Sequence, residues 1–324
     1  MLTSLFSLLS PAGGRGRLSI LIFHRVLPVP DPLFPGEADA ARFDAVCGWL
    51  ARWFHVLPLD TAVQQLRAGR LPARAACITF DDGYADNHGL ALPILQNHGL
   101  TATFFIATDF LGGGRMFNDS VVETVRRAHG PALDLQPLGV SGLGLLDIGS
   151  LAARRTTIGA ILQAIKYLPL AERDELTRKL QSLAGVDTLP DDLMMQPEQV
   201  RTLHRTGMQI GAHTVSHPIL ARLADDAARA EIQDSRSQLQ DLLGAPVGLF
   251  AYPNGKPHED YSAATVRLAR EAGFDAALST AWGAAGRDAD VFQLPRFTPW
   301  DRGRARFGLR LARNLAGGAA AATV

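Results

Sequence analysis

Alternating strand-like and helix-like segments constrain the fold of this chain more than any other feature. Short apolar runs typical of buried strands follow one another, with amphipathic helix-like segments between most of them. Strands that alternate with helices favour a parallel sheet or barrel with helices outside it. A length of 324 residues is sufficient for one large barrel. The expected strands lie at 18–23, 54–58, 76–80, 102–107, 209–212, 248–252, 276–280 and 291–297.

The alternating pattern breaks between about residues 111 and 196. A glycine-rich turn, a Gly- and Pro-containing stretch that alternates like a small hairpin, and further helix-like segments replace it there. Because the pattern resumes afterwards, we interpret this block as an insertion. The predicted organisation is an N-terminal segment, 1–17, a single domain, 18–304, with an insertion at about 111–196, and a C-terminal helix or tail, 305–324.

Composition limits which binding partners and which cellular location we expect. Lys+Arg and Asp+Glu both number 32, so the net charge gives no support to nucleic-acid binding. No run is long enough to predict a transmembrane helix. The apolar run Leu2–Leu9 lacks the preceding basic residues of a signal peptide and equally suits a short surface helix. We expect a cytoplasmic protein, with peripheral membrane contact left open, and buried thiols at Cys47 and Cys77.

Two acidic residues, Asp81 and Asp82, stand directly after an expected core strand and before Gly83. Adjacent carboxylates at such a place raise each other's pKa unless a cation or another positive group offsets the repulsion. An isolated Asp-Asp-Gly is usually an ordinary turn. A divalent ion would explain the pair, because one carboxylate could bind the ion while the other acts as general base on a water molecule.

A second pattern supplies further metal ligands. His213 and His217 are four residues apart and follow the strand expected at 209–212. On a helical turn, residues at this spacing share one face, so both imidazoles could reach one ion. An isolated pair of this kind is usually two surface histidines. Two imidazoles and one carboxylate, from Asp81 or Asp82, are typical of a catalytic metal site with an open position.

These stretches resemble the motifs of a known family. Thr79-Phe-Asp-Asp-Gly83 and His213-Thr-Val-Ser-His217 are similar to the first two motifs of the NodB-like polysaccharide deacetylases, carbohydrate esterase family 4, and Phe250-Ala-Tyr-Pro-Asn-Gly255 more loosely resembles the third. The resemblance covers roughly residues 18–299 apart from the insertion. It implies a distorted (β/α)7 barrel that hydrolyses the N-acetyl group of an amino sugar.

The resemblance also implies a role for each site residue. Asp81 is the general base, and Asp82, His213 and His217 hold one divalent ion. Zinc suits these ligands, with Co, Ni, Mn or Fe as alternatives. The backbone amide of Asn254 contributes to the oxyanion hole. Tyr252, from the same third motif, is a further candidate for substrate contact.

Two departures from the family pattern lead to two further assignments. Ala251 stands where the family often has an arginine that orients the base, and Arg296, at the end of the last strand, is the candidate replacement. The late histidine that protonates the leaving amine in many members is also absent. His24 follows the first expected strand, which neighbours the last one in a closed barrel, so we assign it as general acid. This arrangement resembles the poly-N-acetylglucosamine deacetylase branch.

The sequence therefore predicts a metal-dependent hydrolase whose partner is an N-acetylated glycan, either an exopolysaccharide or its precursor. Chitin or peptidoglycan is the alternative polymer. A small non-sugar amide is the alternative substrate, because the same site would hydrolyse it. A barrel that only binds glycan is disfavoured by the complete set Asp81, Asp82, His213 and His217.

Overall fold

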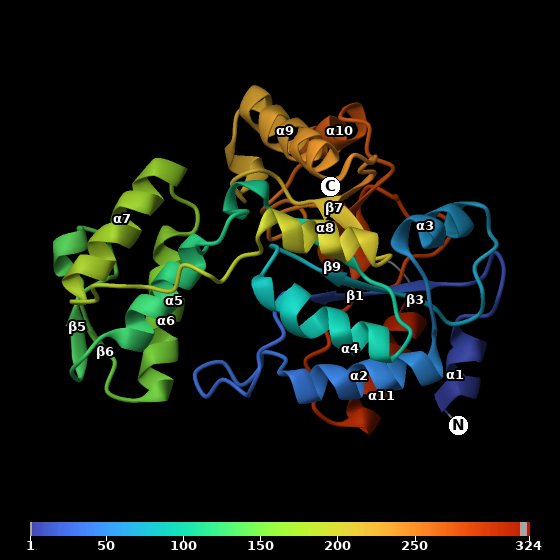
Figure 1. The fold of residues 1–324 in the computed structure, drawn as a ribbon, viewed down its shortest axis with the longest axis horizontal. Coiled ribbons are helices and arrows are strands. Elements are labelled where there is room, and N and C mark those ends of the chain that lie inside the picture. Colours follow the sequence, from blue (N-terminus) through green and yellow to red (C-terminus); the bar gives the residue numbers. More distant parts are fainter. Residues whose placement is uncertain (1, 318–322) are drawn as a thin grey trace. The chain divides into compact units, whose positions relative to one another are not determined.

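Parallel strands form a nearly closed barrel in the larger of two units of the chain (Figure 1). The computed structural model describes residues 2–317 and 323–324. The strands follow the order β1-β3-β4-β7-β8-β9-β10, and the short β2 pairs with the start of β3. This arrangement confirms the predicted distorted (β/α)7 barrel. The strands are β1 (Leu18–Phe23), β2 (His55–Val56), β3 (Ala75–Phe80), β4 (Thr103–Ile106), β7 (Gln209–Ala212), β8 (Leu249–Ala251), β9 (Ala276–Trp282) and β10 (Leu294–Arg296).

The first and last strands of the barrel meet, as the sequence predicts. Phe297, directly after β10, forms a parallel bridge with Leu21 of β1. The backbone N–H of Phe297 donates to the carbonyl of Ile20 at 2.7 Å, and that of Ile22 donates to the carbonyl of Phe297 at 3.1 Å. Since β1 also pairs with β3, the carboxyl ends of β1, β3 and β10 lie at one edge of the barrel.

Alternation along the strands separates an inner from an outer layer of side chains. The helix α3 (Leu59–Arg67) packs on the inner layer, and the side chain of Gln209, at the start of β7, accepts the backbone N–H of Leu59 at 2.6 Å. This helix therefore closes the amino end of the barrel. The inner layer includes Leu18, Ile20, Ala75, Cys77, Phe105, Leu249, Ala251, Ala276, Leu278 and Leu294.

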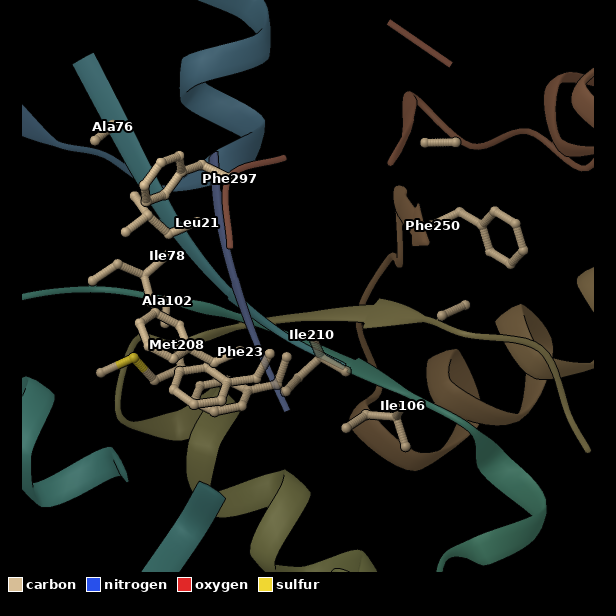
Figure 2. Close-up of a cluster of buried hydrophobic side chains, with 14 of the residues drawn as sticks. Leu21, Phe23, Ala76, Ile78, Ala102, Ile106, Met208, Ile210, Phe250 and Phe297 are labelled. Atoms are coloured by element: carbon tan, nitrogen blue, oxygen red, sulfur yellow. The ribbon is translucent and has the colours of Figure 1, made fainter. Parts of the chain in front are cut away.

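The outer layer packs beneath the surrounding helices (Figures 1 and 2). Figure 2 shows side chains of this layer from several strands, among them Leu21 and Phe23 of β1, Ile78 of β3, Ile106 of β4 and Phe250 of β8. The helical elements of this unit are α1 (Leu2–Leu9), α2 (Ala40–Trp53), α3, the π-helical turn η1 (Asn87–Ala91), α4 (Leu92–Asn97), η2 (Thr108–Phe110), α8 (Pro197–Arg205), η4 (Leu220–Arg222), α9 (Asp225–Leu243), α10 (Ala263–Glu271) and α11 (Arg304–Ala316).

The smaller unit comprises residues Gly112–Met194 together with Pro30–Glu37. Its antiparallel strands confirm the predicted hairpin. The sequence did not predict that a segment from before the second strand would belong here. Leu33 of that segment joins the unit's own apolar core, and Asp31 forms an ion pair with Arg126 at 2.6 Å. The elements are α5 (Phe117–Arg127), β5 (Ala132–Asp134), η3 (Gln136–Leu138), β6 (Leu145–Asp147), α6 (Leu151–Ile165) and α7 (Leu170–Leu183).

Both ends of the described chain belong to the larger unit rather than standing apart from it. The N-terminal apolar run is the helix α1, with Phe6 buried and Leu8 79% exposed. Of the predicted C-terminal helix or tail, α11 is helical, and residues 318–322 lie outside the described residues. Cys47 and Cys77 are free, buried thiols, as predicted, and burial raises the pKa of both. None of the helices in the described part of the chain has the length and hydrophobicity to span a bilayer.

Candidate active site

Asp81 and Asp82 directly follow β3 at the carboxyl edge of the barrel, where they are 2% and 6% exposed. The chain turns sharply at this point, because Asp82 has a φ of 76° and Gly83 a φ of 93°. A left-handed conformation is uncommon outside glycine, although Asp tolerates it better than most residues. Because of this turn, the two neighbouring carboxylates face different partners. Each acid at the end of the core strand is therefore close to its own positively charged or hydrogen-bonding group.

The carboxylate of Asp81 is held by the guanidinium group of Arg296, the last residue of β10. The Nη1–Oδ1 and Nη2–Oδ2 distances are both 2.7 Å, and Nε donates to the carbonyl of Ser279 at 2.8 Å. Arg296 is 1% exposed. Burial alone raises the pKa of Asp81, but the positive charges of Arg296 and His213 outweigh it, so this pKa lies below its ordinary value. Arg296 thus orients Asp81, although Ala251 occupies the position of the family's usual arginine.

Asp82 faces the two histidines instead. Its Oδ1 lies 3.4 Å from Nε2 of His213 and 3.4 Å from Nε2 of His217. Burial raises the pKa of Asp82, but the hydrogen bond from His213 and the nearby imidazole charges outweigh it and hold the pKa well below its usual range. For His213 the effects have the opposite sign. Burial lowers the pKa of His213, but the negative charges of Asp81 and Asp82 outweigh burial and raise this pKa above its ordinary value.

The predicted helical turn between the histidines is wrong. His213 follows β7 directly, and residues 213–217 form a bend in which Thr214 has a φ of 67° and His217 a φ of 54°. An α-helix requires negative φ values. The two imidazole rings nevertheless lie close, with centroids 4.9 Å apart. A loop with two left-handed residues therefore brings together the side chains that helical periodicity was expected to align.

The ring of His213 is oriented by a backbone carbonyl. Its Nδ1 lies 2.7 Å from the carbonyl oxygen of Ala251, at the end of β8. A carbonyl oxygen only accepts hydrogen bonds, so Nδ1 carries the proton. The other ring nitrogen, Nε2, faces Asp82. An outer hydrogen bond of this kind commonly fixes the tautomer of a metal-binding histidine.

Asp82, His213 and His217 could hold a metal ion together. One ligand atom from each lies within 4.8 Å of the other two. Two imidazole nitrogens and one carboxylate oxygen suit zinc and other divalent first-row metals, and three protein ligands leave a position open for water or substrate. The donor set therefore fits a divalent cation. Asp81 remains beside it, with Oδ2 4.0 Å from Nε2 of His213.

His24 directly follows β1, and its side chain is exposed. A positive charge on His24 contributes to lowering the pKa of Asp81 and of Asp82. The side-chain amide of Asn87 donates to the backbone carbonyl of His24 at 2.8 Å and fixes this end of the strand. The meeting of β1 and β10 therefore brings His24 to the same edge as Arg296.

The two candidates from the third motif occupy different environments. Asn254 has a φ of 58°, and its carbonyl accepts the hydroxyl of Thr280 at 2.7 Å. Its backbone N–H donates no hydrogen bond to any residue that the structure describes. Tyr252, in contrast, is fully buried, donates its hydroxyl to the carbonyl of Phe292 at 2.9 Å and stacks on Tyr261. The structure therefore places the side chain of Tyr252 in the core and does not bring it to the site.

Two further contacts that were not predicted from the sequence support Arg296. The hydroxyl of Thr79 lies 3.4 Å from Nη1 and donates to the carbonyl of Leu21 at 2.8 Å. Thr79 is two residues before Asp81 and shares its inward face, so strand alternation was a usable signal. Ser279 contributes only a backbone carbonyl, for which a sequence carries no signal.

The fold and the site define a class of protein: a barrel hydrolase with an arginine-paired carboxylate beside a candidate two-histidine, one-carboxylate metal centre. The family model described as polysaccharide deacetylase matches residues 68–130 and 171–277, more than half of the chain. The chain belongs to the polysaccharide deacetylase family and is, accordingly, a polysaccharide N-deacetylase, a hydrolase of carbon–nitrogen bonds. The matched ranges contain the metal-ligand candidates, Asp81 and Asn254, but neither His24 nor Arg296.

The chain is also similar to a Bacillus protein and to solved structures. YxkH of Bacillus subtilis, named for the same family, is 21% identical over 282 residues, which cover 86% of this chain and 70% of that protein. The Streptococcus pyogenes deacetylase PplD, solved in complex with acetate, matches with a TM-score of 0.57 and 19% identity over 87% of this chain and 92% of its own. IcaB from Ammonifex degensii matches with a TM-score of 0.58 and 16% identity over 95% and 98% of the two chains. These structural likenesses support the (β/α)7 barrel.

Proposed function

We propose that the enzyme removes N-acetyl groups from amino sugars of an exopolysaccharide, or of its lipid-linked precursor, and requires one divalent cation. Zinc suits the site, and Co, Ni, Mn and Fe are alternatives. The observation that carries this proposal is the cluster of Asp82, His213 and His217 within 4.8 Å, beside Asp81. The choice of polymer rests on His24, which stands at the end of the first strand as in the family branch that it resembles.

The carboxylate of Asp81 is suited to accept the proton of the attacking water. A cation in the site would act as a Lewis acid, lowering the pKa of that water and polarising the acetyl carbonyl. Arg296 keeps Asp81 ionised and occupies one direction at each of its oxygens. Oδ2 also lies 4.0 Å from Nε2 of His213, so a water beside that imidazole could give its proton to Asp81.

Negative charge gathers on the carbonyl oxygen of the acetyl group as the water adds. The backbone N–H of Asn254, which has no acceptor among the described residues, would donate a hydrogen bond to that oxygen. Collapse of the tetrahedral adduct breaks the carbon–nitrogen bond, and His24 as imidazolium transfers its proton to the departing amine. Acetate and a free amino sugar are the products.

Replacing His24 with glutamine is expected to lower kcat by about 10²–10⁴-fold and to leave metal content unchanged. Glutamine cannot transfer a proton, whereas the backbone contact with Asn87 does not depend on the side chain. The measurement is acetate release from a sugar acetamide and from an aromatic acetanilide. The anilide should lose less activity, because its weakly basic amine needs less protonation to leave. Equal losses on both substrates would contradict the role of general acid.

The proposed function is tested by acetate release from β-linked N-acetylglucosamine oligomers, first with metal-stripped protein and then with zinc or cobalt restored. We expect no release without metal and recovery with it, because Asp82, His213 and His217 supply the only metal-ligand cluster found among the described residues. Absence of release with every metal, from protein shown to bind one ion, would contradict the proposal and favour a small amide substrate or glycan binding alone.

A further inference from the structure

The loop between the two histidines is held in a conformation that its own residues disfavour. Thr214, with a φ of 67°, is β-branched, and a left-handed conformation is a clear outlier for such a residue. His217, with a φ of 54°, is also left-handed. Conformations of this kind persist only where surrounding contacts impose them. The position of the His217 ring therefore depends on what holds this loop.

Glu231, on α9, binds the loop from one side. Its Oε2 accepts the consecutive backbone N–H groups of Val215 and Ser216, both at 2.9 Å, and its Oε1 accepts the hydroxyl of Ser216 at 2.5 Å. Two successive N–H groups that converge on one anionic oxygen form a compact anion-binding concavity. Hydrogen bonds to an ionised acceptor are shorter and stronger than those between neutral groups. Glu231 thus replaces the hydrogen bonds that a helix would have given this segment.

The carbonyl groups of the same loop are bound from another element. The backbone N–H of Thr108, in η2, donates to the carbonyl of Thr214 at 3.1 Å, and that of Asp109 donates to the carbonyl of Val215 at 3.0 Å. Backbone contacts of this kind do not depend on which side chains are present. Glu231, in contrast, holds the loop from outside through its side chain, so a substitution can remove this contact.

We propose that Glu231 is a positioning residue for the metal centre: by fixing the peptide groups of Val215 and Ser216, it sets the place of His217 relative to Asp82 and His213. This inference rests on the proposed function, because it assumes that these three residues bind a cation. Residues that support metal ligands from outside typically change metal affinity by about 10–100-fold when they are replaced. The carboxylate of Glu231 contacts the loop backbone and the hydroxyl of Ser216, so it acts through the loop and is a positioning residue, not a catalytic one.

The test compares Glu231→Ala, Glu231→Gln and Asp234→Ala. Asp234 is an exposed acid on the same helix and serves as the matched control. Zinc affinity of each metal-stripped protein is measured by competition with a chromophoric chelator, and the visible absorption spectrum of each cobalt-loaded protein reports the geometry around the ion. Thermal unfolding of the metal-free proteins shows that each variant is folded at the temperature used.

We expect Glu231→Ala to weaken zinc binding by about 10–100-fold and to alter the cobalt spectrum. Glu231→Gln, which keeps an uncharged acceptor for the N–H groups, should lie between alanine and wild type and provides the comparison if the alanine variant is unfolded. Asp234→Ala should match wild type. Wild-type affinity and an unchanged spectrum in both Glu231 variants would overturn the positioning role alone. A wild-type protein that binds no cation would overturn the proposed metal centre, and this inference with it.

Discussion

Asp81→Asn is expected to lower kcat for acetate release by about 10²–10⁴-fold while the enzyme retains its metal. Asparagine preserves the shape of the side chain but cannot accept the proton of the attacking water. The metal should remain, because the candidate ligand atoms come from Asp82, His213 and His217, and both oxygens of Asp81 face Arg296. The measurements are kcat for acetate release and metal content per chain after purification.

Asp82→Asn provides the matched control, since it makes the same chemical change one residue further along the chain. It should reduce both activity and metal content, because its Oδ1 is the atom that faces the two histidines. If Asp81→Asn lost the metal and Asp82→Asn kept it, the two roles would have to be exchanged. Loss of metal from both variants would make Asp81 a ligand as well and would leave the general base unassigned.

Arg296→Met is expected to lower the free energy of unfolding by about 3–5 kcal/mol at neutral pH. Asp81 and Arg296 are both buried, so removing the guanidinium group leaves a charged carboxylate in the protein interior without its partner. Methionine fills similar space without a charge. Chemical denaturation of the metal-free proteins measures the change. Arg205→Met is the control, because its ion pair with Glu198 is exposed to solvent and should contribute little to stability.

The stability difference between wild type and Arg296→Met should depend on pH. In the wild type, the folded-state pKa of Asp81 is lowered, so its contribution to stability is present above the ordinary pKa of about 3.9 and is lost as pH falls through the folded-state value. Without Arg296, burial dominates and raises the pKa of Asp81. The variant can then relieve its unpaired charge by protonation, and the difference should narrow as pH falls. A difference that stays constant between neutral pH and about pH 4 would contradict this account.

Local patterns predicted the barrel because each strand is a short apolar run between helices, and burial on both faces makes such runs distinct. The same logic located Asp81, Asp82 and His24, because residues that directly follow parallel strands gather at one edge of the barrel. Arg296 was placed correctly for that reason too. Its bidentate contact with Asp81 could not be derived from the pattern, since it depends on how β10 meets β1 across the whole sequence.

Other features depended on information that no local pattern carries. The histidine spacing suggested a helical turn, but backbone and side-chain contacts from η2 and α9 impose a left-handed loop instead. Tyr252 stands in a motif beside Asn254, yet strand alternation turns its ring into the core. The segment Pro30–Glu37 joins the smaller unit through Leu33 and Asp31, contacts that are remote in sequence.

The bridge between β1 and Phe297 also determines when, during synthesis of the chain, the active site can be completed. The ion pair that orients Asp81 spans 215 residues, and contacts of such separation form late because closing a long loop costs entropy. The family-matched ranges end at residue 277, so a growing chain contains all of them before Arg296 is added. Until the last strand docks, the Asp81 carboxylate lacks its guanidinium partner. Catalytic competence should therefore arise in a single late step, when the barrel closes, rather than grow as successive motifs emerge.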